Sequence, residues 1–351
     1  MRRIPAIIAS VLLLVLLSAC GSQEQQAESN HPKYKLRSDQ DAVYVGFALD
    51  TLQEQRWYRD KDAFENKVKA LGGNVKTLAS NGDQEVQLQQ VNLLIKEGVD
   101  VLVVVPVDAV ASGEIVTMAH AAGIKVVSYD RLILNADLDY YVSFDNHKVG
   151  QLQAQYIVDK VKSGNIAYVG GSPSDNNAKL IREGSLDVLQ PLIDNGSIKL
   201  VYDKLTDSWS GDIAAQQIKA YFNQGGERFD GIVTGYDGLA RGAIEAIGDQ
   251  AGAIPVSGQD AELDALQRIM KGTQTMTVYK SLTLIGEQAA SLAVEIGSGQ
   301  TAETTTTIDN GEKKVPAILL EPVAVTKDNM EETVIKDGHY TSEQIHQPAK
   351  P

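Results

Sequence analysis

The chain has 351 residues, a formal net charge of −14 and one cysteine. This length favours two domains over one, and an acidic chain without a basic stripe or an arginine-rich helix is an unlikely partner for nucleic acid. The single cysteine also excludes a disulfide within the chain.

The N-terminus has the pattern of a secretory signal. Two arginines precede an apolar run that ends in Leu17-Ser18-Ala19-Cys20, which resembles a lipobox. The run is shorter than the ~20 residues that cross a bilayer as a helix. The sequence therefore predicts a signal peptide over residues 1–19 and lipidation of Cys20, with an uncleaved signal anchor as the alternative. Residues 20–42 are mostly polar and predict a lipid anchor with a flexible tether, so the protein is expected to be extracytoplasmic and held at the membrane by lipid.

In the body of the chain, short β-branched runs alternate with amphipathic helical stretches, which is the pattern of a doubly wound α/β fold. The first series comprises strands at 43–48, 75–78, 101–105 and 125–128, a helix at 62–71 that ends at Gly72-Gly73, and a second helix capped by Asp83. The run from Val101 to Val105 is wholly apolar, which is typical of a parallel strand that is covered on both faces.

A second series begins with the strand at 165–169 and repeats features of the first. Gly196-Ser197-Ile198-Lys199 is similar to Gly73-Asn74-Val75-Lys76, and the segment 229–233 is similar to 99–103. Two similar halves predict two lobes, each a doubly wound parallel sheet, with a cleft between them.

Ligands of open parallel sheets bind beyond the carboxyl ends of the strands. Charged, amide and aromatic residues recur at these ends in both halves: Asp50, Arg56, Trp57, Asp130, Arg131, Asp175, Asn176, Asn177, Asp207, Trp209, Tyr236, Asp237, Gln259, Asp260 and Lys280. Carboxylates accept hydrogen bonds, Arg and Lys donate them and Asn does either, while aromatic rings suit the C–H faces of a sugar. The set therefore indicates a site for a neutral polyol.

Each of these residues also has a simpler interpretation. Asp130 and Arg131 could form a surface ion pair of little energetic value, and Asn176-Asn177 could be turn or helix-cap residues. Trp57 and Trp209 could be ordinary buried packing residues. The convergence of the whole set on one cleft favours the binding site.

Several longer stretches carry a family resemblance. They are Arg56-Trp57, 128–131, 143–150, 170–180, 257–280 and 333–338. In these stretches the chain resembles the periplasmic binding proteins of the ribose and galactose type, and within them the xylose-binding members. The resemblance covers the chain from about Val43 to Gly338.

The resemblance implies a site for D-xylose or a similar monosaccharide, with no cofactor and no metal. It places six side chains at positions that hydrogen-bond the sugar: Arg56, Asp130, Arg131, Asn177, Asp260 and Lys280. It places Trp57 and Trp209 where aromatics sandwich the sugar ring. Tyr236 departs from the family, which has a ligand-contacting amide at this position, so the exact sugar and the affinity stay open.

The resemblance also implies lobes that the chain enters more than once, joined by a hinge of several strands. The N-terminal lobe is expected to comprise residues 43–145 and 281–322, the C-terminal lobe residues 146–280 and 323–342, and a tail residues 343–351. The implied partner is an ABC permease; the alternative is a sensor that presents its closed form to a histidine kinase or chemoreceptor.

An enzyme is the alternative from another class. Asp130, Asp237 and Asp260 could supply the paired carboxylates of a glycoside hydrolase, but the neighbouring Arg and Lys residues favour ionised carboxylates over a general acid. The five histidines show no nucleophile or metal spacing, and no Gly-x-Gly-x-x-Gly follows the first strand. The sequence therefore predicts a binding protein and not an enzyme.

Overall fold

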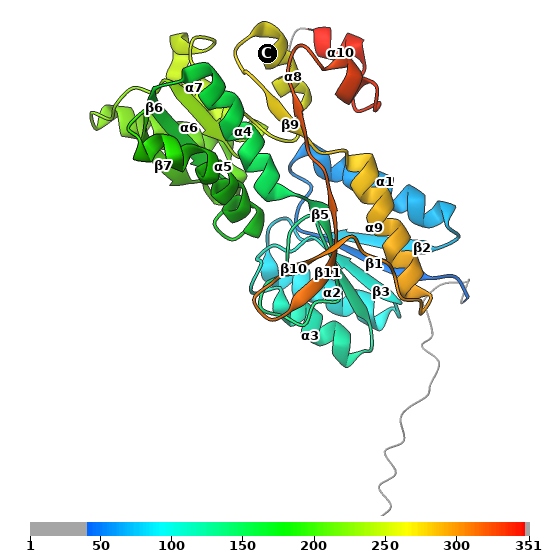
Figure 1. The fold of residues 1–351 in the computed structure, drawn as a ribbon. Helices are drawn as coiled ribbons and strands as arrows, with labels where there is room; N and C mark the ends of the chain where they lie inside the picture. Colours follow the sequence, from blue (N-terminus) through cyan, green and yellow to red (C-terminus); the bar gives the residue numbers. More distant parts are fainter. Residues whose placement is uncertain (1–40, 348–351) are drawn as a thin grey trace, which may run out of the picture. The chain divides into compact units, whose positions relative to one another are not determined.

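The computed structural model describes residues 41–347 of the chain (Figure 1). The predicted signal peptide, Cys20 and nearly all of the predicted tether lie outside the described residues. Among the helices of this described range, none combines the length and the apolar character that crossing a membrane requires.

The first lobe is built on a seven-stranded sheet with the order β10-β11-β5-β4-β3-β1-β2. Neighbouring strands are parallel except at one edge, where β10 runs antiparallel to β11. The strands are β1 (Tyr44–Leu49), β2 (Asn74–Ala79), β3 (Val101–Val104), β4 (Lys125–Tyr129), β5 (Tyr140–Phe144), β10 (Thr306–Asp309) and β11 (Lys314–Leu320). The central strand β3 is buried along its whole length, as its apolar sequence predicts.

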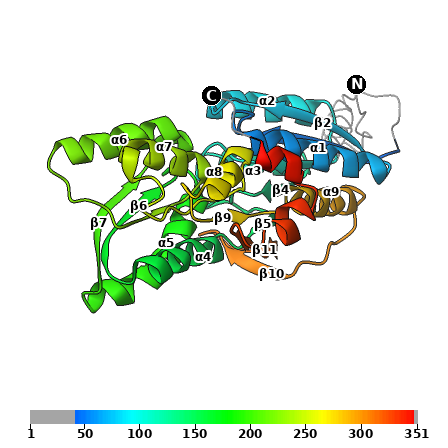
Figure 2. The same cartoon turned by 90° about the horizontal axis from the view of Figure 1, so that it is seen from above.

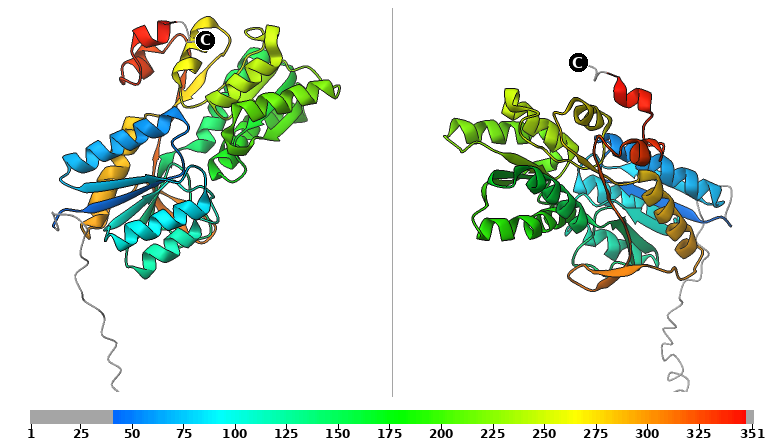
Figure 3. Two further views of the ribbon diagram at one scale, coloured as in Figure 1. Left: turned by 180° about the vertical axis from the view of Figure 1, so that it is seen from behind. Right: turned by 45° about the horizontal axis from the view of Figure 1, so that its top comes forward.

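Helices cover both faces of this sheet. Successive side chains of a strand point to opposite faces, so Val45 and Phe47 of β1 join one core with α1 and α9, while Tyr44 and Ala48 join another with α2 and α3. The helices are α1 (Gln55–Ala70), α2 (Gln84–Lys96), α3 (Gly113–Ala121) and α9 (Leu282–Gly297). Helix α9, orange in Figures 1 and 3, lies beside the blue α1 although the whole second lobe separates them in sequence.

The second lobe has a three-stranded parallel sheet, β7-β6-β8, beside an antiparallel pair, β9 and β12. These strands are β6 (Gly164–Gly170), β7 (Ile198–Leu205), β8 (Gly231–Thr234), β9 (Thr277–Tyr279) and β12 (Val323–Val325). Four helices cover the parallel sheet: α4 (Asn146–Val161), α5 (Asn176–Asp194), α6 (Gly211–Asn223) and α7 (Asp237–Ile247). Figure 2 shows α4 and α5 on one side of β6 and β7, and α6 and α7 on the other.

The C-terminal part of the chain completes the second lobe. Helix α8 (Leu263–Lys271) and helix α10 (Ser342–His346) share a core with the π-helical turn Glu331–Ile335. The segment that the sequence assigns to a tail, from residue 343, begins within α10, and its Ile345 is buried beside Leu266 and Ile269 of α8. The C-terminal boundary of the packed chain therefore lies later than expected.

Within residues 41–347, the chain passes between the lobes after β5, after β9 and after β11. The order of elements is thus that of two doubly wound α/β lobes joined by three connections. Each connection leads directly from a strand of one lobe to an element of the other. Small backbone changes at these three points are therefore sufficient to move one lobe relative to the other.

Two features differ from what periodicity predicts. Helix α1 begins at Gln55 and not at 62, because its first turns bury polar residues, Arg56 and Asp60, that interrupt the apolar pattern. Strands β5, β10 and β11 are not identified by the alternation, and β11 joins the sheet beside β5 from a distant part of the sequence. Both differences arise because contacts with distant parts of the chain, and not the local apolar pattern, determine where these elements form.

Glycines allow α4 and α5 to pack at very short range. A Cβ on Gly150 would lie 1.9 Å from the carbonyl oxygen of Ile181, and a Cβ on Gly184 would lie 1.9 Å from that of His147. The obstructing atoms belong to the backbone, which cannot rotate away as a side chain can. The two helices must therefore separate if either glycine gains a side chain.

We expect Gly150→Ala and Gly184→Ala each to lower the free energy of unfolding by about 1–3 kcal/mol or more, the usual effect of overpacking. The matched control is Gly113→Ala at the start of α3, where the new Cβ would meet only the Ala136 Cβ at 3.4 Å. Alanine is the better helix former, so this variant should be neutral or slightly stabilised. Urea unfolding followed by circular dichroism measures all three, and equal stabilities would contradict the proposed helix contact.

Candidate ligand-binding site

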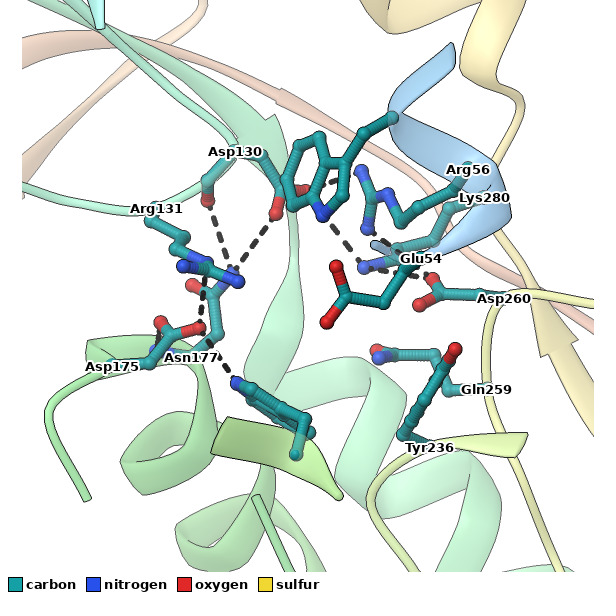
Figure 4. Close-up of a pocket in the computed structure, with 12 residues that line it drawn as sticks. Glu54, Arg56, Asp130, Arg131, Asp175, Asn177, Tyr236, Gln259, Asp260 and Lys280 are labelled. Carbon is teal, nitrogen blue, oxygen red and sulfur yellow. Dashed lines mark hydrogen bonds and ion pairs between the residues drawn. The ribbon is translucent and has the colours of Figure 1, made fainter. Parts of the chain in front are cut away.

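One pocket gathers residues from both lobes at the carboxyl ends of the strands (Figure 4). Its empty volume is about 360 Å³, and its lining consists of Glu54, Arg56, Trp57, Asp130, Arg131, Asp175, Asn177, Trp209, Tyr236, Gln259, Asp260 and Lys280. The nine residues that the sequence predicts to bind ligand are among them, whereas Asp50, Asn176, Asp207 and Asp237 of the strand-end set are not.

Most of the lining residues lie in segments that follow a strand, which is why the chain brings them together. Asp130 and Arg131 come directly after β4, and Lys280 comes directly after β9. Tyr236 lies between β8 and α7, and Asn177 lies in the first turn of α5. Parallel strands end at the same edge of a sheet, so the ends of the two sheets supply the two walls of the pocket.

A buried charge cluster joins the lobes inside the pocket. The guanidinium of Arg56 lies 3.1 Å from the Asp130 carboxylate of its own lobe and 3.4 Å from the Asp260 carboxylate of the other. The ammonium of Lys280 lies 3.1 Å from Asp260 and 3.8 Å from Asp130. Lys280 is only 2% exposed, and a lysine is almost never buried to this extent unless it is paired.

The cluster keeps Asp130 ionised. Burial alone would raise the pKa of this carboxyl, but the nearby positive charges of Arg56, Lys280 and Arg131 outweigh it and lower the pKa to about 2. Asp130 therefore accepts hydrogen bonds at any physiological pH and has no proton to give.

A second ion-pair group lies at the opposite end of the pocket. Arg131 pairs with Asp50 of its own lobe and with Asp175 of the other lobe, the latter at 2.9 Å. Asp175 also accepts a hydrogen bond from the Trp209 indole N–H at 3.2 Å, and the Asn177 amide donates to the Asp130 backbone carbonyl at 3.2 Å. Asp130 and Arg131 are buried and bind different partners, so the simple surface pair is not what forms.

Two tryptophans provide the aromatic walls. Trp57 is buried against the guanidinium groups of Arg56 and Arg131, whose Cζ atoms lie 4.4 and 5.4 Å from its ring centroid. Trp209 is partly buried and rests on Gly171, where a Cβ would lie 2.1 Å from the indole. Its ring meets that of Tyr236 edge-on, at 6.3 Å and 89°. Both tryptophans thus pack well and also face the pocket.

Three buried polar atoms of the lining have no hydrogen-bond partner among the described residues. They are Glu54 Oε2, Trp57 Nε1 and Gln259 Oε1. Buried polar groups in native proteins are nearly always paired, so unpaired groups in a pocket wall are free to bind a ligand.

Sequence reasoning did not single out three of the lining residues. The strand-end rule applied to the sequence includes Asp175 and Gln259, but it does not distinguish them from their neighbours. In the structure Gln259 follows only an isolated β-bridge at Val256 and not a strand. Glu54 gives no such signal, because it reaches the pocket only as the residue before α1, and the start of that helix is not predicted. The sequence also predicts no partner for Tyr236, whose hydroxyl donates to Glu262 Oε1 at 2.5 Å.

Asp237, the third carboxylate of the hydrolase alternative, lies outside the pocket lining. It is fully buried and accepts hydrogen bonds from Gln274 at 2.7 Å, Thr277 at 3.0 Å and the Glu262 backbone at 3.0 Å. Burial raises its pKa well above the usual value. Asp237 therefore fixes the chain around α8 and β9. Within residues 41–347, no group of three or more His, Cys, Asp or Glu side chains is arranged to hold a metal ion.

Three lining residues have left-handed backbone conformations that are uncommon outside glycine. The φ angles are 59° at Asp130, 55° at Trp209 and 87° at Asp260. Such conformations store strain and concentrate at functional sites, where the surrounding structure holds them in place. Here each belongs to a residue whose side chain lines the pocket.

Comparison with known proteins agrees with this geometry. Residues 45–301 match the family described as periplasmic binding protein domain. The D-xylose-binding periplasmic protein of Haemophilus influenzae is 46% identical over 304 residues, which cover 86% of this chain and 92% of the relative. The protein of the same name from Escherichia coli is 43% identical over 333 residues, which cover 94% and 98%.

A solved structure gives the same result in three dimensions. The carbohydrate transporter solute binding protein of Chloroflexus aurantiacus, in complex with D-glucose, superposes with a TM-score of 0.81 at 33% sequence identity, over 86% of this chain and 98% of that one. The family resemblance carried by those sequence stretches and the expected α/β fold are therefore confirmed. The chain belongs to the periplasmic binding protein family and has the type I fold of that family.

Proposed function

We propose that this protein binds D-xylose, or a closely similar monosaccharide, between its lobes and presents the closed form to an ABC permease. The observation that carries the proposal is one pocket lined from both lobes, in which two tryptophans accompany buried and mutually paired charges. The names of the two relatives that cover most of the chain support xylose as the sugar.

The chemistry of the lining suits a neutral sugar. Every sugar hydroxyl can both donate and accept a hydrogen bond. The pocket offers donors in Arg131, Asn177 and the Trp57 indole, and acceptors in Asp130 and the unpaired Gln259 oxygen. Because most of the charges are already paired with one another, the ligand need carry no charge of its own.

The same lining argues for binding without catalysis. Glycoside hydrolysis needs one carboxyl group that is protonated at the working pH. Asp130 has a pKa of about 2 and shares its cations with Asp260, so neither residue resembles a general acid. Asp237, the remaining candidate, is enclosed by protein hydrogen bonds.

A pentose is favoured over a hexose by the comparisons, and Tyr236 is the residue that bears on this choice. The relatives named for D-xylose are 46% and 43% identical to the chain, while the structure that contains D-glucose is 33% identical. Tyr236 is buried in the wall and fills space that a smaller side chain would leave open.

The proposed mechanism is ligand-driven closure. Arg56 and Lys280 contact carboxylates of both lobes, and Arg131 reaches from one lobe to Asp175 of the other. A sugar that touches both walls adds contacts available only when the walls approach, so it shifts the population towards the closed form. A permease that recognises the closed form then receives loaded protein.

Anchoring by a lipid on Cys20 is part of the proposal and rests on the sequence pattern alone. The same closed form could serve a histidine kinase or chemoreceptor, so sensing is the second candidate function. The partner decides between the two functions, since sugar binding is common to both.

Removal of a single charge from the interlobe cluster should abolish sugar binding. We expect Asp130→Asn and Lys280→Met to weaken D-xylose binding at least about thirtyfold, because each leaves a buried charge without its partner. Lys199→Ala, which removes an exposed ion pair with Glu227, is the control and should bind normally. Calorimetry with a pentose and hexose panel measures the effect; unchanged affinity in both cluster variants would exclude this pocket.

Intrinsic fluorescence should report directly on the pocket. The chain has two tryptophans and both line it, so D-xylose should change the emission in a saturable way. Most of the change should disappear in Trp209→Phe, because Trp209 is the more exposed of the two and loses contact with water when sugar covers it. L-xylose, the mirror image, is the control. A sugar that binds by calorimetry without altering the emission would have to bind elsewhere.

Co-purification separates transport from sensing. Full-length protein, isolated from membranes of its host in the presence of D-xylose, should bring down a permease. Lys280→Met, which we expect to stay open, should recover much less of it. A histidine kinase or chemoreceptor recovered in place of any permease would reject the transport assignment and support the sensor.

A further inference from the structure

A residue outside the pocket lining fixes the side chain of Tyr236. The Tyr236 hydroxyl donates to Glu262 Oε1 at 2.5 Å, and the Glu262 backbone N–H donates to the buried Asp237 carboxylate at 3.0 Å. Asp237 is itself held by Gln274 and Thr277. The orientation of the phenol is therefore fixed by hydrogen-bonded residues that are anchored in the core of the second lobe.

The ring of Tyr236 is held as firmly as its hydroxyl. One side meets Trp209 at a right angle, and another lies over Gly238, where a Cβ would be 2.5 Å from the ring. Tyr236 as a whole is 8% exposed. Contacts with Trp209, Gly238 and Glu262 therefore hold both the ring and the hydroxyl.

Three lone-pair acceptors lie near one another in the lining at Tyr236. Tyr236 gives its only proton to Glu262, so its oxygen can only accept a further hydrogen bond. The Gln259 amide nitrogen donates one of its two N–H groups to the Gly235 carbonyl at 3.1 Å, and Gln259 Oε1 has no partner among the described residues. Glu54 Oε2 is a third buried acceptor with no partner within residues 41–347.

Figure 4 shows Glu54, Gln259 and Tyr236 on one side of the pocket, across from Arg131 and Asn177. The far side offers guanidinium and amide N–H donors. The near side, which we call the acceptor end (Glu54, Gln259 and Tyr236), offers unpaired lone pairs next to Arg56 and Lys280, whose charges are paired with Asp260.

We propose that Tyr236, positioned by Glu262, is a specificity-determining residue of the acceptor end, because its oxygen receives a hydrogen bond from the ligand without donating one. This end takes a ligand hydroxyl as donor and rejects a group that can only accept, such as an ether, a fluorine or a carboxylate. The physical reason is that a buried acceptor opposite another acceptor stays unsatisfied, which costs far more than the loss of an ordinary contact. The inference deepens the proposed function and rests on it.

The test uses D-xylose and its monodeoxy and monodeoxyfluoro analogues at every hydroxyl position, titrated by calorimetry into the full chain. Fluorine accepts weakly and never donates, whereas hydrogen does neither. Burial raises the pKa of Glu262 to about 7, so titrations are run at about pH 8.5, where the carboxyl is ionised and Tyr236 is the donor.

One sugar hydroxyl is expected to face the acceptor end. When that hydroxyl is replaced, the fluoro and the deoxy analogues should bind equally weakly, each at least about tenfold below D-xylose. At positions that face Arg131 or Asn177, the fluoro analogue should bind better than the deoxy one. Tyr236→Phe should reduce the penalty at the first position alone, by about threefold or more, because it removes one of the acceptors that the missing hydroxyl leaves unpaired.

Glu262→Leu provides the second arm. Without its carboxylate partner, the Tyr236 hydroxyl is free to donate into the pocket, so the fluoro analogue at that position should gain at least about threefold over the deoxy analogue. Tyr202→Phe is the matched control: Tyr202 is buried in the same lobe, away from the pocket lining, and its hydroxyl has no partner among the described residues. Tyr202→Phe should leave the ratio of fluoro to deoxy affinity unchanged at every position.

The outcomes distinguish this inference from the proposed function. If the fluoro analogue binds better than the deoxy analogue at every position in the wild-type protein, the acceptor end contains a donor and the inference is wrong, while sugar binding stands. The inference is also wrong if Tyr236→Phe and Glu262→Leu leave the relative affinities of D-xylose, the fluoro analogues and the deoxy analogues as they are in the wild type. If the wild-type protein binds no monosaccharide, the proposed function fails, and the inference fails with it.

Discussion

The interlobe charge cluster is the constraint on which the rest of the molecule depends. Arg56, Lys280, Asp130 and Asp260 are all buried, and each finds an oppositely charged partner on another segment of the chain. Removal of such groups from water is costly, and only close, mutual pairing compensates for it. Separation of the lobes would break only the contacts of this cluster that cross between them, Arg56 with Asp260 and Lys280 with Asp130. Water would replace these partners, so open and closed forms would lie close in free energy. A small ligand can then decide between them.

Much of the architecture is predictable because it follows from local pattern. The wholly apolar run of β3 indicates a strand with two covered faces, and the rule that ligands lie beyond strand ends leads to Asp130, Asn177 and Lys280 without any knowledge of the fold. Family and fold class are confirmed by the comparisons. That these side chains hold a sugar stays a prediction.

What the sequence does not predict depends on contacts between distant segments. The first turns of α1 carry buried charges, and Arg56 finds a partner far along the chain. The sequence of these turns therefore lacks the apolar periodicity that predicts a helix. Glu54 reaches the pocket only because α1 begins where it does. The contact from Tyr236 to Glu262 needs the turn at Asp260 and Ala261, both with left-handed backbone. No periodicity in the sequence reports such a turn.

The backbone conformations of the lining residues have a consequence for how such a pocket diversifies. At Asp130 and Asp260 the left-handed φ disfavours bulky or β-branched replacements whatever their chemistry. Tyr236 has an extended backbone, with φ of −162°, that any residue can adopt. A change of ligand by substitution is therefore easier at positions of the second kind, because the backbone at the strained positions accepts few side chains. Tyr236 lies where the backbone allows substitution freely.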